Sequence, residues 1–97
     1  MEELEKNVLK LASEKGLLYS GKTYAQIIKA VEELDEVCRA ILKNGKPQIE
    51  DGIGDVIVTL IILAAQNNLT VKDCLKSAWE EIKDRKGKTE NGTFIKD

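Results

Sequence analysis

The sequence predicts a single all-α domain, a four-helix bundle-type protomer, and three observations lead to this prediction. Four segments with helical apolar periodicity follow one another with short connections. Only one of them is β-branched enough to pass for a strand, and a lone strand would leave its backbone groups unpaired. The chain has 97 residues, 42% of them hydrophobic but only 4% aromatic, which suits one core of helices packed on helices.

The first helix is expected over residues 2–15, where an apolar stripe is followed by Gly16 as a natural C-terminal cap. The second is expected to begin at Thr23, because Gln26 three residues later completes a capping box. It should stop at the glycine and proline of residues 44–47. Steps of four and three residues along it define an apolar seam, which we expect to face the bundle. The seam consists of Ile27, Val31, Leu34, Cys38 and Ile41.

The third segment, Ile49 to Asn67, is the ambiguous one. Residues 56–62 are β-branched enough for a buried strand, and periodicity alone does not exclude this. The apolar run continues through Ala65 without a turn signal, which is long for a strand and favours a helix. A helix that is apolar nearly all round must be buried on most sides. We therefore expect it to contact partner subunits as well as partner helices.

A fourth helix is expected to open at Thr70, which forms a cap with Asp73, and to end near Asp84. The chain then becomes basic and rich in glycine. Residues 86–97 are expected to form a loop or mobile tail at the end of a single domain that spans residues 1–97.

Composition excludes several classes of function. The chain contains no His, which removes the usual zinc frameworks and Ser-His-Asp triads. Cys38 and Cys74 are isolated and are expected to be small buried hydrophobic residues, not a disulfide. A net charge of −2 gives no global attraction to nucleic acid or membrane. The acidic N-terminus lacks signal-peptide features and the longest apolar run is too short to span a bilayer, so the expected compartment is the cytoplasm.

Residues 16–23 match the phosphate-binding expression GxxxxGK[ST]. That motif binds phosphate when a strand leads into it and a helix leaves it, within a parallel sheet. Here the preceding segment has helical periodicity and no further strands are predicted. We interpret these residues as a glycine cap, a short connector and a helix start.

Two pairs of carboxylates share helix faces. Glu33 and Glu36 are three residues apart on the second helix, and Asp51 and Asp55 are four apart on the third. Asp55 opens the most hydrophobic segment, where an unpaired charge would be costly, so we expect it to have a cationic partner, which could be Lys, Arg or a metal ion. Four carboxylates from two facing helices are oxygen ligands suited to Mg²⁺ or Mn²⁺.

Such a cage supports phosphate chemistry, in which the ion neutralises phosphate charge and activates a water molecule. In a chain without His the general base must be a carboxylate, and Glu32 or Glu36 is the candidate. Lys29 shares a helix face with Glu33 and is placed to bind phosphate. Further basic groups follow the fourth helix at Lys83, Arg85 and Lys86. The alternative is that the acids form a solvated helix face and the bases complement a helix C-terminus.

Taken together, these residues resemble the all-α nucleotide pyrophosphohydrolases of MazG type. Residues 33–36 match the family's ExxE motif, preceded by the extra Glu32, and residues 52–56 resemble its ExxD motif in the form G-I-G-D-V. The ending E-I-K-D-R-K-G-K followed by N-G-T-F-I-K is similar to small phage and bacterial members. The resemblance runs from about Lys29 to the C-terminus.

The resemblance implies Mg²⁺-dependent hydrolysis of (d)NTPs to the monophosphate and pyrophosphate. It also implies a homodimer or dimer-based homotetramer with sites near the subunit interface. Gly52 stands where ExxD has its first acid. Asp51 is the better substitute because it shares a face with Asp55, and Glu50 is the other possibility. The competing interpretation is a catalytically weak or inactive helical module that binds nucleotide or a protein partner.

Overall fold

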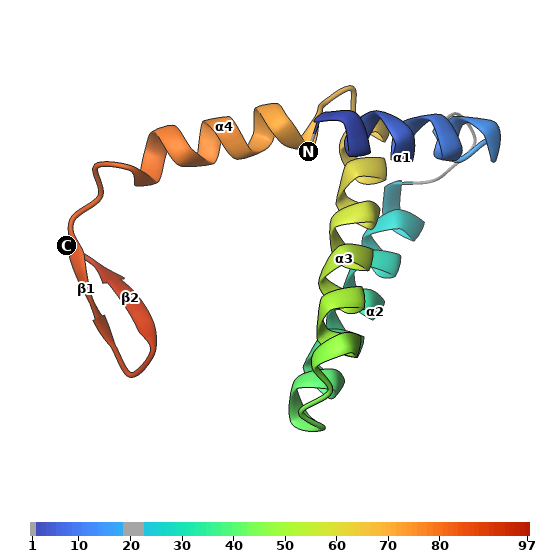
Figure 1. Ribbon diagram of the computed structural model, residues 1–97. Coiled ribbons are helices and arrows are strands. Elements are labelled where there is room, and N and C mark those ends of the chain that lie inside the picture. Colours follow the sequence, from blue (N-terminus) through green and yellow to red (C-terminus); the bar gives the residue numbers. More distant parts are fainter. Residues whose placement is uncertain (1, 19–22) are drawn as a thin grey trace.

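The computed structural model describes residues 2–18 and 23–97, and this part of the chain contains four helices and a β-hairpin (Figure 1). The helices are α1 (Glu2–Glu14), α2 (Thr23–Leu42), α3 (Lys46–Gln66) and α4 (Val71–Ile82). The strands are β1 (Gly87–Glu90) and β2 (Thr93–Lys96). The predicted four helices are confirmed, and the ambiguous third segment is a helix. No helix within the described ranges is long and apolar enough to cross a membrane.

Two helix ends follow predicted capping residues, Gly16 and Thr70, whereas α3 begins at Lys46, three residues before the predicted Ile49. Gly16 adopts a left-handed φ of 73° just after α1, and Asn44 and Asn68 do the same after α2 and α3, with φ of 54° and 59°. Thr70 caps α4, since its side chain accepts a hydrogen bond of 3.1 Å from the backbone N–H of Asp73. Local sequence therefore determines where the helices stop.

The GxxxxGK[ST] match falls partly on residues 19–22, which lie outside the described residues. A helix precedes the motif and another begins at Thr23, as the cap-and-connector interpretation predicts. The side-chain amide of Gln26 reaches across to α3 and donates a 3.0 Å hydrogen bond to the carbonyl oxygen of Thr59. This polar side chain therefore ties α2 to α3.

The core of the chain lies where α2 runs antiparallel to α3 and where α1 crosses their upper end (Figure 1). The buried apolar side chains are small or branched: Ala12, Val37, Ala40, Ile61, Ile62 and Ala64. Gly52 is also buried on α3, and a Cβ atom built on it would lie 2.8 Å from Cγ2 of Val37. The two helices therefore approach each other at Gly52 too closely for a side chain to fit without movement of Val37.

The apolar seam of α2 does not face α3, so the prediction that this seam packs inside the bundle is wrong for one copy of the chain. Its aliphatic members are 43–61% exposed: Ile27, Val31, Leu34 and Ile41. The stripe that α2 buries instead consists of Glu33, Val37 and Ala40. Cys38 and Cys74 are exposed, which also corrects the expectation that both are buried. Because α2 contacts its neighbour through small side chains and a glycine, its larger aliphatic side chains remain on the outer face.

The C-terminal segment differs from the predicted loop or mobile tail, because β1 and β2 pair antiparallel with Gly87 opposite Lys96 and Glu90 opposite Thr93. Asn91 and Gly92 form the turn, with φ of 51° and 77°. Positive φ at both turn residues matches the twist of a tight hairpin.

We call residues 71–97, which comprise α4 and the hairpin, the arm. The arm extends away from the other helices (Figure 1), and none of the residues of α4 is buried. The radius of gyration is 15.7 Å, compared with about 12.5 Å for a compact chain of this length. A single copy is therefore more extended than a compact domain.

Two acids of α1 hold the first turn of α4. Glu5 is only 6% exposed, and its Oε1 accepts a 3.0 Å hydrogen bond from the backbone N–H of Val71. Glu2 forms an ion pair with Lys72, which lowers the pKa of Glu2 through a hydrogen bond and the ammonium charge. The direction of the arm is thus set by contacts with the opposite end of the chain.

Replacing Glu5 with Ala is expected to lower the free energy of unfolding by roughly 1–3 kcal/mol, because a hydrogen bond to a buried carboxylate is lost. Thermal denaturation followed by circular dichroism measures this change. Glu3→Ala is the matched control, since Glu3 is exposed on the same helix and should change stability by less than about 0.5 kcal/mol. Equal melting temperatures for the two variants would contradict the role of Glu5.

Candidate functional site

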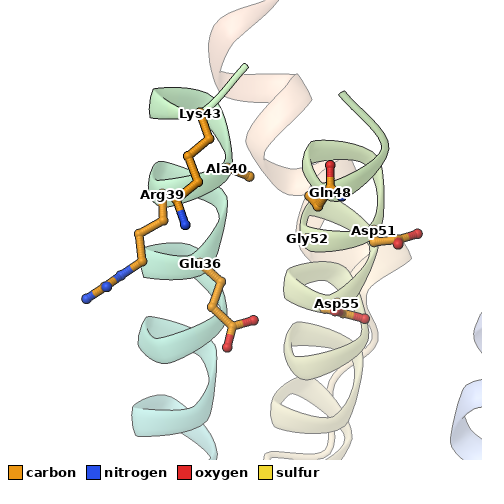
Figure 2. A pocket seen from close by; sticks show the side chains of 8 residues that line it. All are labelled: Glu36, Arg39, Ala40, Lys43, Gln48, Asp51, Gly52 and Asp55. Carbon is orange, nitrogen blue, oxygen red and sulfur yellow. The ribbon is translucent and has the colours of Figure 1, made fainter. Parts of the chain in front are cut away.

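A pocket of about 340 Å³ lies between the end of α2 and the start of α3 (Figure 2). Its lining residues are Glu36, Arg39, Ala40, Lys43, Gln48, Asp51, Gly52 and Asp55. Three of the four predicted metal ligands therefore line one pocket, where the carboxylates of Asp51 and Asp55 point away from α2 (Figure 2). The short turn between α2 and α3 brings them together, because it places the last turns of one helix beside the first turns of the other.

The carboxylates take the positions that helical spacing predicts. Asp51 and Asp55 project from the same side of α3, and Glu36 extends from α2 toward the gap between the helices (Figure 2). All three residues are exposed to solvent at the pocket. A ligand can therefore reach each of them directly.

Glu33 is the fourth predicted metal ligand, and it is buried beside the pocket and does not line it. Nζ of Lys29 lies 3.0 Å from Oε1 of Glu33 and 4.0 Å from Oε2 of Glu32. The hydrogen bond and the charge of Glu33 raise the pKa of Lys29. In this arrangement Lys29 is the counter-charge of Glu33.

Neighbouring acids change the pKa of Glu36. The negative charge of Glu33, and next a hydrogen bond with Glu33, raise the pKa of Glu36 above its usual value. Asp55 adds to this increase, while Lys29 opposes it. The raised pKa shows that negative charge is crowded here beyond what Lys29 neutralises.

The donor set suits a hard divalent cation, because three carboxylates and the amide of Gln48 line the pocket and the acids outnumber the two bases there. Within the described ranges, no three Asp, Glu or Cys side chains lie close enough together to hold one metal ion. The residues fit Mg²⁺ in chemistry, and binding it requires the side chains to converge.

The remaining predicted site residues lie elsewhere. Glu32 lines a different hollow on α2, with Val31 and Asp35, and does not meet Glu36 at the pocket. Lys83, Arg85 and Lys86 lie at the far end of α4 and beyond it, remote from the α2–α3 turn (Figure 1). Lys83 pairs with Glu80 at 2.7 Å. One copy of the chain therefore does not bring these basic residues to the acids.

Sequence reasoning missed three polar residues of the pocket, namely Arg39, Lys43 and Gln48. Nε of Arg39 donates to Oδ2 of Asp35 at 2.9 Å. Lys43 forms no ion pair within the part of the chain that the structure describes, and its side chain runs back along α2 in the direction of Glu36 (Figure 2). The missed signal was the seven-residue spacing of Glu36 and Lys43, which places both on one face of α2.

Gly52 lies between the two acids of α3, and its environment explains why it is not an acid. A Cβ atom there would lie 2.8 Å from Val37, a β-branched residue with little rotational freedom in a helix. The neighbouring Asp51 points away from this contact and lines the pocket (Figure 2). An acid at position 51 is therefore compatible with the close packing of α2 and α3.

Comparison with known proteins gives two matches. A family model described as MazG nucleotide pyrophosphohydrolase domain matches residues 21–89, which include the whole pocket and most of the arm. An uncharacterized 18.2 kDa protein of Haemophilus phage HP1, from the rep-hol intergenic region, is 36% identical over 69 residues. These are 71% of this chain and 42% of the phage protein, so the chain spans less than half the length of that relative. No solved structure matches the chain.

Proposed function

The chain belongs to the family of MazG nucleotide pyrophosphohydrolase domains, and on this premise we propose that it hydrolyses nucleoside triphosphates to the monophosphate and pyrophosphate. The observation that carries the proposal is the pocket that Glu36, Asp51, Asp55 and Lys43 line together. Carboxylates suit the cation that accompanies a triphosphate, and an ammonium suits the phosphates themselves.

Mg²⁺, with Mn²⁺ as the alternative, is the cofactor in this proposal. Glu36, Asp51 and Asp55 would hold it from the pocket, with Glu33 beside them. When bound, the ion supplies neutralisation of phosphate charge and lowers the pKa of the attacking water. The raised pKa of Glu36 supports this assignment, because a cation would relieve the crowding of negative charge.

The side chains of this chain have separate roles in the proposed reaction. A water molecule attacks the α-phosphorus, the bond to the bridging oxygen of the β-phosphate breaks, and pyrophosphate leaves. Glu36 is the favoured acceptor for the proton of that water, because it lines the pocket and Glu32 does not. Lys43 would stabilise the charge on the departing pyrophosphate.

A homodimer or a dimer-based tetramer is part of the proposal. The accessible surface of one copy is 7797 Å², compared with about 5,500 Å² for a compact monomer of 10.8 kDa. The difference of about 2,300 Å² is similar to the area that each subunit buries in a large permanent interface. The exposed seam of α2 supports the same conclusion.

Incubation of the protein with each (d)NTP and Mg²⁺, followed by separation of the products, tests the proposal. The expected products are the monophosphate and pyrophosphate in equal amounts. Orthophosphate with a diphosphate would contradict cleavage at the α-phosphorus. Nucleotide binding without any turnover would favour the non-catalytic helical module.

Lys43→Ala is expected to raise the KM for nucleotide roughly 10- to 100-fold, because a charge-assisted hydrogen bond to phosphate is lost. Lys43→Arg should retain most of the affinity, since it keeps the charge. Lys46→Ala is the matched control, because Lys46 is exposed at the start of α3 and does not line the pocket. Initial-rate kinetics on the three variants measure the effect, and an equal KM for the two alanine variants would disprove the role of Lys43.

A further inference from the structure

The basic end of the arm and the acidic pocket are kept apart within one copy. Asp55 lies 11 residues before the end of α3, about 16 Å along the helix axis. Lys83 lies about 18 Å from the start of α4, which leads away across the end of α3 (Figure 1). No lysine or arginine side chain bridges such a separation.

Several contacts hold the connection between α3 and α4, residues 67–70, in an orientation that keeps the arm away from its own pocket. Glu5 accepts a hydrogen bond from the first N–H group of α4, and Glu2 pairs with Lys72. The backbone N–H of Leu69 donates to the carbonyl oxygen of Ala64 at 2.8 Å, which closes the end of α3. Swinging the arm toward the pocket would break these contacts.

The arm also lacks support within its own chain. Large apolar side chains along it are about half exposed: Leu75, Trp79, Ile82, Phe94 and Ile95. An isolated helix of 12 residues is marginal in water, and so is an isolated two-stranded hairpin. Because nothing else within the described ranges covers these side chains, the arm requires a surface on another molecule.

Charge complementarity identifies that surface. Residues 83–97 contain five basic and three acidic residues, while residues 1–82 contain ten basic and fourteen acidic residues. At the pocket the acids Glu36, Asp51 and Asp55 outnumber the bases Arg39 and Lys43. The basic end of the arm and the pocket are therefore complementary surfaces of the same chain that do not meet in one copy. In a two-fold symmetric dimer, the arm of each copy would lie on the pocket of the other copy. Both arms and both pockets would then have a partner.

We propose that the arm of one protomer lies on the α2–α3 body of its partner and brings Lys83, Arg85 and Lys86 to the phosphates in the partner's pocket. This inference rests on the proposed function for its substrate. One copy exposes about 2,300 Å² more surface than a compact monomer of this mass. Docking of each arm on the partner could bury an area of this size. It also explains why the basic residues follow α4 but lie far from the acids of their own chain.

Mixed dimers test the exchange. One variant, Asp55→Asn, has a defective pocket and an intact arm; the other has an intact pocket and the triple change Lys83→Ala, Arg85→Ala and Lys86→Ala. Each variant alone should have low activity. Dimers containing one chain of each, isolated with two different affinity tags, should recover about half of the wild-type activity, because one of two sites is complete. Mixed dimers no more active than the parents, or full activity of the triple variant alone, would overturn the proposal.

A triple change of three exposed lysines on or next to α1 is the matched control: Lys6→Ala, Lys10→Ala and Lys15→Ala. It removes the same charge away from the arm and should leave activity near the wild-type level. A loss equal to that of the arm variant would show that net charge alone is responsible and would overturn the proposal.

Trp79 provides a readout that does not depend on turnover, since it is the single Trp of the chain and lies on the arm. Its fluorescence should shift to longer wavelength as dilution dissociates the dimer, in parallel with the loss of dimer in sedimentation velocity. An unchanged spectrum across dissociation, or a monomer at all concentrations, would refute arm docking. Absence of wild-type turnover with a shifted Trp79 spectrum would reject the proposed function and leave the docking supported.

Discussion

Asp55→Asn is expected to lower NTP hydrolysis roughly 100-fold or more and to raise the melting temperature of the metal-free protein. The two effects have one cause. Asp55 lines the pocket and is one of the acids that raise the pKa of Glu36. Removing its charge relieves repulsion in the empty site, and it also removes an oxygen that the proposed cation needs.

The sign of the pH dependence follows from the direction of the Glu36 shift. An acid whose pKa is raised in the folded state binds protons more readily when folded than when unfolded. The metal-free wild type should therefore become more stable, as far as Glu36 is concerned, when the pH falls from neutrality through the raised pKa. Asp55→Asn should reduce this gain, because the shift becomes smaller.

Melting curves at pH 7 with EDTA and with Mg²⁺, combined with kcat measurements, check these expectations. Mg²⁺ should raise the melting temperature of the wild type and have little effect on Asp55→Asn. Glu50→Gln is the control, because Glu50 is exposed on α3 but does not line the pocket. Asp51→Asn should behave like Asp55→Asn if Asp51 replaces the acid missing at Gly52. A metal-free Asp55→Asn protein that melts below the wild type would contradict the crowding argument.

Gly52→Glu restores the acid of the ExxD motif, yet we expect it to destabilise the protein by roughly 1–3 kcal/mol. The new Cβ would lie 2.8 Å from Cγ2 of Val37. The glutamate side chain would also leave the backbone at a buried position that faces α2. Each kcal/mol lowers the melting temperature of a domain this size by about 4–8 °C. Thermal denaturation therefore detects the loss easily.

Two further variants isolate the steric cause. Adding Val37→Ala to Gly52→Glu should recover part of the lost stability, because the opposing methyl groups are removed. Gly54→Ala should be neutral or should stabilise by up to about 1 kcal/mol, since a Cβ atom there meets nothing within 4 Å. If Gly52→Glu were as stable as the wild type, the close approach of α2 and α3 would not be the reason for the glycine.

The sequence predicts well those features that depend on local chemistry. Gly16 and Thr70 end and begin helices as expected, because capping needs only neighbouring residues. The shared face of Asp51 and Asp55 follows from helical spacing alone. Even the hairpin had a local signal, Asn91-Gly92, which the glycine-rich character of the segment obscured.

Features that depend on distant contacts were not predictable in this way. The seam of α2 is apolar, but the face that packs on α3 is decided by small residues at Ala40 and Gly52. The separation of Lys83 from the pocket depends on the hydrogen bond between Glu5 and Val71, which lie 66 residues apart in the sequence. No periodicity within one segment contains this information. Lys43 was not predictable for a different reason, because it stands apart from the run of basic residues that follows α4.

The short turn between α2 and α3 has a kinetic consequence. Helices joined so closely make contacts of low sequence separation, and such contacts form early and fast because little chain entropy is lost in closing the loop. The arm, in contrast, gains its packing only from a second chain under the arrangement proposed above. Folding should then divide into a rapid step that depends on one molecule and a slower step that depends on concentration. The newly synthesised chain would become an enzyme only after it meets another copy of itself.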